Sequence, residues 1–256
     1  MSAMTDAFER ALVFQREFER RRTELAIRST HGTAYLTPSL PRVYDLNTFA
    51  VDHGVDASAQ ELIAEVDPIL GSQGLAHRKI TFEDVLGRRV EPAFREAGWQ
   101  VDEHLVMPHV YPAPALDLTQ VEEVEAGELV PVWKAGMHRD DLDADTVDQL
   151  VAARFRPCDG FVIRHFATRV DGRPASYCEL FSDGATGQIE SVMTEPELRG
   201  RGLGKLVVAG ALAASQAVHD FTFLVADAND WPQELYRQLG FEAAGTTYRF
   251  LLRAQP

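Results

Sequence analysis

The residues best suited to chemistry lie in one glycine-dense turn between an extended run and an apolar helix. Arg199, Gly202 and Gly204 stand in an R-x-x-G-x-G spacing, and Gly200 adds a third glycine. Glycine adopts positive φ without a Cβ penalty, so several backbone N–H groups can point at one anion. A helix that starts here also has unsatisfied N–H donors and the positive end of its dipole. The pattern therefore predicts a pyrophosphate-binding loop.

Spacing excludes two other kinds of phosphate-binding loop. A Walker loop requires G-x-x-x-x-G-K-[ST], but the residue five before Gly204 is Arg199, and neither Ser nor Thr follows Lys205. A dinucleotide fingerprint requires G-x-G-x-x-G, which neither Gly200 nor Gly202 begins. The loop therefore belongs to another class of anion site.

Hydrophobic periodicity and turn residues predict the elements that position this loop. Strands are expected at 42–52, 76–84, 99–107, 115–124, 161–170, 175–183, 187–194, 220–227 and 246–253. Helices are expected at 5–28, 58–70 with a break at Pro68 and Gly71, 85–97, 126–137, 143–155, 203–214 and 229–241. Strands that alternate with helices predict an α/β layer structure.

The run V-M-T-E-P-E-L-R-G-R-G-L-G at 192–204 resembles the acetyl-CoA signature of the GNAT superfamily of N-acetyltransferases, a strand followed by [QR]-x-x-G-x-[GA]. The order and lengths of the expected elements from 115 to 254 resemble a complete GNAT domain. The resemblance implies acetyl-CoA as co-substrate and no metal. It assigns contacts with CoA to Val192, Met193, Thr194, Arg199, Gly200, Arg201, Gly202, Leu203, Gly204, Lys205 and Asn229.

The resemblance also implies a general acid. Family members commonly have an Asn in the turn after the next strand and a Tyr seven residues on, and Asn229 and Tyr236 stand at that spacing. Tyr236 is therefore expected to protonate the CoA thiolate, and the alternative is a core residue of an amphipathic helix. Asn229 is expected to contact CoA or to start the helix.

The general base is less well defined by the resemblance. Some members have a Glu on the strand that precedes the Asn, but the residue five positions before Asn229 is Leu224. Glu190 is the expected replacement, with Glu179 behind it, and alternation places Glu190 on the same face as Val192. Glu190 is equally suited to a structural salt bridge. His165 lies within a strand and is expected to line the core or the substrate pocket.

Composition narrows the expected cellular compartment and the expected binding partners. The chain has 256 residues, and its 45% hydrophobic content supports a packed core. Its net charge of -14 argues against a nucleic-acid-binding surface. Cys158 and Cys178 have no metal-ligand spacing and are expected to be buried thiols in a reducing cytoplasm. With no apolar run of 18 residues and no signal-peptide pattern, a soluble, unexported monomer or homodimer with no membrane partner is expected.

The first half looks like a partial copy of the second. AFREAGWQ at 93–100 aligns with LYRQLGFE at 235–242, the strand at Ile80 falls on Phe223, and Val51 falls on Thr194. Two GNAT-like units are therefore expected, each a mixed, mostly antiparallel twisted sheet flanked by helices. The expected domains are a degenerate one at 1–107, a Pro-rich linker at 108–114 and an acetyl-CoA-binding one at 115–256. The first half lacks R-x-x-G-x-G and is expected to bind no CoA.

The expected function is acetyl transfer from acetyl-CoA to a primary amine of a small molecule or peptide by direct attack on the thioester. A non-catalytic acyl-CoA-binding or protein-interaction module is the alternative. The presence of Tyr236 favours the enzyme, and the missing Glu near Asn229 favours the alternative. The acidic balance is compatible with a cationic acceptor such as a polyamine, an aminoglycoside or a protein amine.

Overall fold

The computed structural model describes residues 3–253, and its elements follow the expected alternation. The helices are α1 (Ala3–Arg22), α2 (Ala59–Ser72), α3 (Val85–Glu96), α4 (Ala126–Arg139), α5 (Ala144–Arg154), α6 (Leu203–Gln216) and α7 (Pro232–Gln238), with short 3-10 helices at Tyr44–Leu46 and Pro196–Leu198. The strands are β1 (Leu25–Arg28), β2 (Gly32–Leu36), β3 (Thr48–Val51), β4 (Arg78–Phe82), β5 (Gln100–Pro108), β6 (Val121–Val124), β7 (Val162–Val170), β8 (Arg173–Ser182), β9 (Thr186–Thr194), β10 (Phe221–Asp227) and β11 (Gly245–Leu252).

The chain divides into two compact units that are discontinuous in sequence. The N-terminal unit consists of Gln15–Leu105, Ala144–Pro157 and 246–253, and the C-terminal unit of 3–14, Val106–Asp143 and Cys158–Gly245. This division differs from the expected boundary at 108–114, because the last strand, β11, pairs with β4 of the N-terminal unit. The alternating apolar pattern of β11 predicted a strand correctly but carried no information on its partner.

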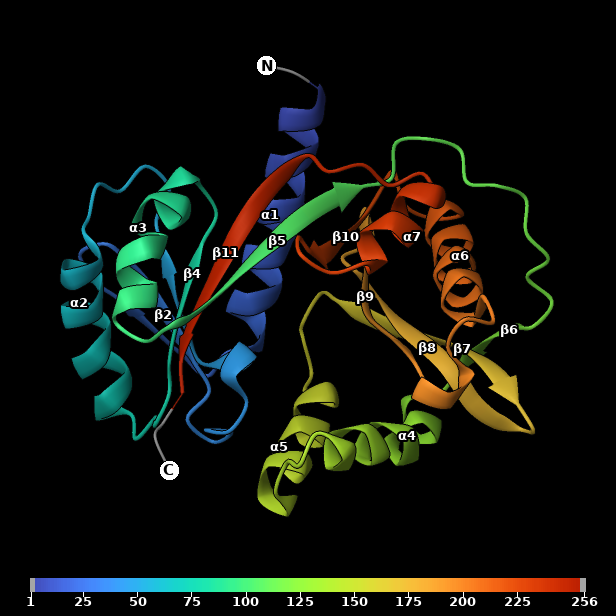
Figure 1. The fold of residues 1–256 in the computed structure, drawn as a ribbon, viewed down its shortest axis with the longest axis horizontal. Helices are drawn as coiled ribbons and strands as arrows, with labels where there is room; N and C mark the ends of the chain where they lie inside the picture. The colour runs from blue at the N-terminus through green and yellow to red at the C-terminus, as the bar shows by residue number, and fades with distance from the viewer. Residues whose placement is uncertain (1–2, 254–256) are drawn as a thin grey trace. The chain divides into compact units, whose positions relative to one another are not determined.

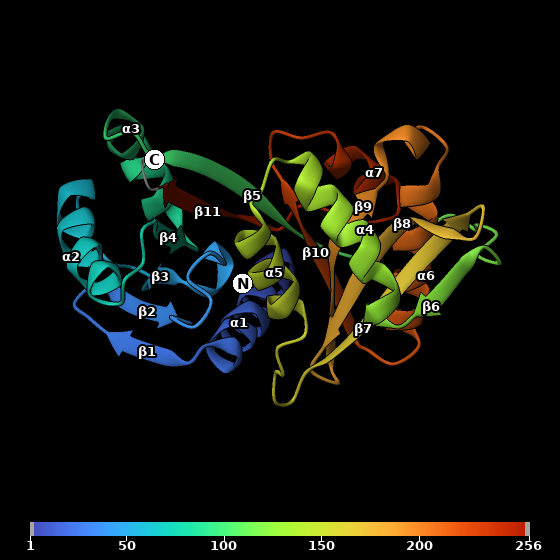
Figure 2. The same ribbon diagram turned by 90° about the horizontal axis from the view of Figure 1, so that it is seen from below.

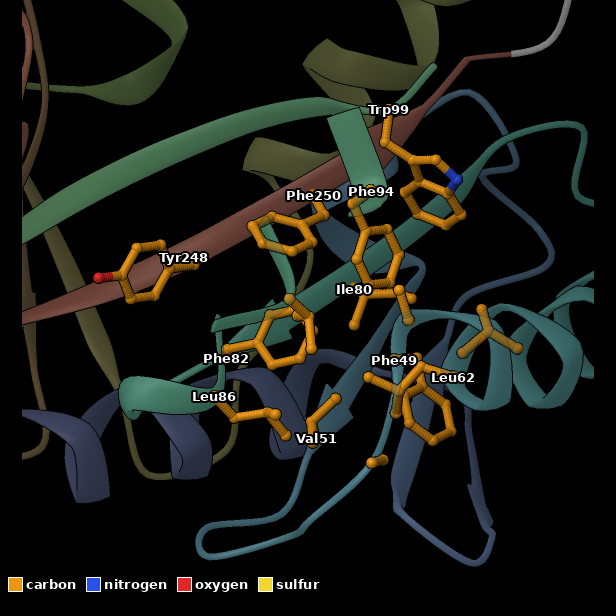
Figure 3. Packing of buried hydrophobic residues seen from close by; sticks show 14 of the residues in the cluster. Phe49, Val51, Leu62, Ile80, Phe82, Leu86, Phe94, Trp99, Tyr248 and Phe250 are labelled. Atoms are coloured by element: carbon orange, nitrogen blue, oxygen red, sulfur yellow. The ribbon is translucent and has the colours of Figure 1, made fainter. Parts of the chain in front are cut away.

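The N-terminal unit has strands in the order β1-β2-β3-β4-β11-β5. Strands β3 and β4 pair in parallel, whereas β1–β2, β2–β3 and β4–β11 pair antiparallel, as expected for a mixed, mostly antiparallel sheet. Helices α2 and α3 pack on one face of it (Figure 1). Their apolar side chains meet the strands in a core built around Phe49, Phe82, Phe94 and Phe250 (Figure 3).

Replacing Phe94 by alanine should lower the free energy of unfolding by about 3–5 kcal/mol, because a large buried ring leaves a cavity. Phe94 is fully buried and meets Trp99 edge to face at 4.9 Å between ring centroids. Urea denaturation followed by far-UV circular dichroism measures the loss. Val85→Ala, at a side chain that is 83% exposed at the start of α3, should change stability by no more than about 0.5 kcal/mol. Equal losses in the two variants would contradict the packing shown in Figure 3.

The C-terminal unit has strands in the order β10-β9-β8-β7-β6, and only β9 and β10 pair in parallel. Helix α4 packs on one face through Trp133, which shares a cluster with Tyr177 of β8. Helix α6 lies on the other face, where the Cys178 thiol donates to the carbonyl of Val207 at 3.6 Å. Figure 2 shows these two helices on either side of the strands. The structure thus confirms the α/β class and a mixed sheet flanked by helices.

The same order of strand, helix, strand, helix and strand occurs in both halves of the sequence, from β3 to β5 and from β9 to β11. Helix α6 starts 144 residues after α2, close to the expected offset of 143. The first strand departs from it. In the N-terminal unit Phe49 lies opposite Ile80. In the C-terminal unit the residue that corresponds to Ile80 at an offset of 143 is Phe223, and it lies opposite Gln188. Gln188 comes 139 residues after Phe49, not 143. The register therefore differs by four residues from the alignment that the sequence suggested.

Two local predictions were wrong, and a third segment has contacts that the sequence did not indicate. The helix expected to 28 ends at Arg22, because Leu25–Arg28 pairs with the strand that ends at Leu36. Helix α2 continues through Pro68 to Ser72, since the face that includes Leu70 is buried in the core. The segment expected as a linker is partly held in the C-terminal unit, where Val110 N–H donates to the Gly240 carbonyl at 2.9 Å.

Residues 3–253 contain neither a membrane-spanning helix nor a cluster of metal-binding side chains. No helix in this part of the chain has the length and apolar character needed to cross a bilayer. No group of three or more His, Cys, Asp and Glu side chains in the same residues could hold a metal ion.

Candidate functional site

The glycine turn lies at the start of α6, as the sequence predicted. Gly200 has φ of 76° and Gly202 has φ of 78°, the left-handed region in which an L side chain is strained. A Cβ added to either would meet nothing within 4 Å, so the outer side of the turn is open. Exposed Arg199 and Arg201 flank it, and Arg199 Nε donates to the Thr194 carbonyl at 3.3 Å.

The start of α6 differs from the matching start of α2. In α2, Ser58 is the N-cap, its side chain accepts from Glu61 N–H, and the Glu61 carboxylate accepts from Ser58 N–H in return. Within the described residues no side chain caps α6, whose N-cap is Gly202. The first N–H groups of a helix need acceptors. In α2 the Ser58 side chain accepts from one of these N–H groups, whereas in α6 no described side chain accepts from them.

Strand β9, which leads into the turn, has a bulge at Ser191. Glu190 lies opposite Glu179 and Met193 opposite Tyr177, so the bulged strand has one residue more than its partner. Ser191 has φ of 54°, rare for a residue other than glycine and frequent near functional sites. The prediction that Glu190 and Val192 share a face assumed strict alternation. The bulge breaks it, and Glu190 shares a face with Met193 instead.

Beyond the bulge, β9 is tied to the turn. The pairing of β9 with β10 covers Thr186–Ile189 and Phe221–Leu224 and, in the part of the chain that is described, ends there. Ser176 and Thr194 hydroxyls lie 2.9 Å apart, and a Cβ added to Gly204 would come within 3.1 Å of Thr194 Oγ1. Strand end and helix start are thus fixed in close contact, and Gly204 is the residue that allows it.

Tyr236 lies on α7 in the same unit and is buried, with 7% of its surface exposed. Burial raises the pKa of its phenol, and the negative charge of Glu190 raises it further. The hydroxyl is therefore protonated at neutral pH and lies within electrostatic range of Glu190. Tyr236 and Glu190, the residues expected to be acid and base, therefore lie in the same unit and influence each other electrostatically.

Glu190 is half-buried and has a polar neighbour that the sequence did not reveal. Gln188 Nε2 donates to its carboxylate at 2.8 Å. Glu179, on the next strand, is buried and lies opposite both Glu190 and His165. Predicting that these side chains are neighbours requires the registers between β7, β8 and β9, and a single sequence does not contain that information.

The residues expected to contact CoA differ in how much of their surface is exposed. Val192, Thr194, Gly204 and Lys205 are half-buried, Leu203 is buried, and Met193, Arg199, Gly200, Arg201, Gly202 and Asn229 are exposed. Lys205 Nζ donates to Gln238 of α7 at 3.1 Å and therefore links the two helices of the site. The backbone N–H of Asn229 donates to Asp227, in the turn after β10.

Comparisons with known proteins agree with this geometry. Residues 119–241 match the model of the acetyltransferase (GNAT) family, a range that includes the glycine turn and Tyr236. No curated protein matches the sequence significantly.

Solved structures share the fold at low sequence identity. A functionally unknown conserved protein from Staphylococcus epidermidis ATCC 12228 is 18% identical with a TM-score of 0.70, over 90% of this chain and 93% of that one. A GCN5-related N-acetyltransferase from Kribbella flavida is 18% identical with a TM-score of 0.60, over 95% and 94%. A tandem GNAT protein from the clavulanic acid biosynthesis pathway is 16% identical with a TM-score of 0.53, over 82% and 76%.

Proposed function

Through its residues 119–241 this chain belongs to the GNAT family of acetyltransferases, and from this premise we propose that it transfers the acetyl group of acetyl-CoA to a primary amine. The observation that carries the proposal is the uncapped, glycine-lined start of α6 directly after a bulged strand. The pyrophosphate would accept from the N–H groups at 200–205, with Arg199, Arg201 and Lys205 adding positive charge. The C-terminal unit would therefore bind acetyl-CoA, and the capped α2 start of the N-terminal unit would not.

Backbone groups at the end of β9 would hold the acyl end of the co-substrate. Residues 192–194 follow the bulge, where the pairing of β9 with β10 has ended. Their backbone groups would face the pantetheine arm and the acyl carbonyl. An N–H that donates to the carbonyl oxygen stabilises the charge that develops there during attack, which is a large contribution in acyl transfer.

Glu190 and Tyr236 would divide the proton chemistry. A cationic amine must lose a proton before its nitrogen can attack, and the half-buried Glu190 carboxylate is the group that would take it. Tyr236 would give its proton to the departing thiolate. Because its pKa is raised, it is a weaker acid than an ordinary phenol. To act in the next turnover the phenol must regain a proton, and the attacking amine would supply it.

The proposal is tested by incubating the protein with acetyl-CoA and each of three amines, spermidine, kanamycin and a lysine-containing peptide. A thiol reagent then measures the CoA that is released. We expect amine-dependent release with at least one acceptor and an acetylated product of the matching mass. Binding of acetyl-CoA without release in any mixture would favour the alternative, a non-catalytic acyl-CoA-binding module.

Glu190→Gln should lower kcat by about 10²- to 10⁴-fold at pH 7, because the amide cannot take the amine proton. The deficit should shrink as the pH approaches about 10, since an ordinary alkyl ammonium then loses its proton to water. A pH profile of kcat measures both effects. Glu234→Gln, which removes an exposed carboxylate from α7, is the control and should leave the profile unchanged. A deficit in Glu190→Gln that is constant with pH would contradict the assignment of the base.

A further inference from the structure

A row of three ionisable side chains crosses β9, β8 and β7 beside the proposed site. Glu190 lies opposite Glu179, and Glu179 lies opposite His165. Residues directly opposite on antiparallel strands have Cβ atoms about 4.5–5.5 Å apart on one face of the sheet. The three side chains are therefore consecutive neighbours. The proposed reaction uses only the first of them.

The inner two members are buried. Glu179 is 4% exposed and His165 is 7% exposed, and 3.8 Å separates Glu179 Oε1 from His165 Nε2. A buried charge is costly unless an opposite charge lies beside it. Imidazole is the side chain that most readily gains a proton near neutral pH. If His165 gains a proton, the product is a buried ion pair rather than an isolated charge.

The surroundings of the row come from several elements. Helix α4 places Trp133 against the imidazole, with 5.9 Å between ring centroids, and Val124 of β6 lies opposite His165. Arg164, the next residue along β7, pairs with Glu123 at 2.7 Å. At the other end of the row, Gln188 donates to Glu190, and the Tyr236 phenol lies within electrostatic range.

We propose that Glu190, Glu179 and His165 form a proton relay for acetyl transfer, in which the proton taken from the amine passes through Glu179 and is held on His165. The inference rests on the proposed function. His165 and Glu179 act through Glu190 and are positioning residues. Their contribution is to return Glu190 to its carboxylate form within each turnover.

The balance of the reaction leaves one proton that the acid and the thiolate do not use. The amine nitrogen of an ammonium substrate carries three hydrogens, and the nitrogen of the amide product carries one. The C–N bond forms with the nitrogen electron pair, and the C–S bond breaks with its pair on sulfur. One of the two protons lost from nitrogen replaces the proton that Tyr236 gives to the thiolate. The other is the net proton of the reaction: the row holds it while the amine attacks, and after the products leave it returns through half-buried Glu190 to solvent.

The test is chemical rescue of His165→Ala, assayed with the fastest acceptor among spermidine, kanamycin and the lysine peptide. We expect kcat at pH 7 to fall by about tenfold or more while the KM for acetyl-CoA stays within about twofold. Added imidazole should restore kcat. Pyrazole, a ring of the same size but a much weaker base, should not. His138→Ala, an exposed position on α4, should behave as the parent.

Equal rescue by the two rings would show that the cavity needs filling, and an unchanged kcat would show that the imidazole has no part in the reaction. Either result would overturn the relay. Should His165→Ala fail to fold, His165→Asn keeps a polar side chain of similar length that cannot hold a proton. It should show the same loss, and parental kcat in that variant would also refute the proposal. Absence of acetyl transfer by the parent contradicts the proposed function itself, whereas an active parent with a fully active His165→Asn contradicts only the relay.

Discussion

Replacing Gly202 by aspartate should weaken the binding of acetyl-CoA by at least about 100-fold, or roughly 2.7 kcal/mol, without unfolding the protein. Gly202 is the N-cap of α6, and aspartate is a favoured capping residue. Its carboxylate would satisfy the N–H groups that the pyrophosphate needs, much as Ser58 and Glu61 do in α2. The added negative charge would also repel the phosphates. Calorimetric titration with acetyl-CoA measures the loss.

The control separates this effect from backbone strain. Gly172, in the hairpin between β7 and β8, has φ of 76°, and a Cβ there would also meet nothing within 4 Å. Gly172→Asp therefore adds the same side chain with the same strain at a distant turn of the same unit, and its affinity for acetyl-CoA should equal that of the parent. Parental affinity in a folded Gly202→Asp variant would refute the phosphate site.

Replacing Tyr236 by phenylalanine should lower the rate of acetyl transfer by about 10²- to 10⁴-fold and leave the dissociation constant of acetyl-CoA nearly unchanged. The ring would keep its packing, since Phe241 meets it edge to face at 6.4 Å between centroids. The matching helix α3 is built with Phe94 in a fully buried position, so the fold does not require the hydroxyl. Only the proton donor to the thiolate is lost.

Single-turnover transfer to the fastest acceptor of the three-amine panel measures this rate apart from product release. Tyr248→Phe removes a hydroxyl from another buried tyrosine, on β11, and is the matched control with an expected rate equal to the parent. A Tyr236→Phe rate within about twofold of the parent would make Tyr236 a packing residue. The thiolate would then leave unprotonated or take its proton from water or the ammonium ion.

The features that the sequence predicted well depend on local chemistry. The glycine turn follows from positive φ at Gly200 and Gly202, and the start of α2 follows from the capping preference of Ser58 and Glu61. Periodicity located most strands to within a few residues because one face of each is buried. The α/β class followed from these elements, and the mostly antiparallel pairing followed from the resemblance to the GNAT superfamily.

The features that it missed depend on pairing between distant strands. The pattern of β11 is the same whichever sheet it joins, so its pairing with β4 could not be predicted from the strand alone. The bulge at Ser191 depends on the register between β8 and β9, and it reversed the face assigned to Glu190. Glu179 and His165 are neighbours only because of the registers between these strands. The sequence therefore indicated each residue as a candidate but not their proximity.

The central claim is that acetyl-CoA binds at the start of α6 and not at the matching start of α2. Amide hydrogen exchange of the full chain, with and without saturating acetyl-CoA, tests it most directly, because bound N–H groups exchange more slowly. The account predicts slower exchange at 200–205 and unchanged exchange at 56–61. Protection at 56–61 with no change at 200–205 would contradict it.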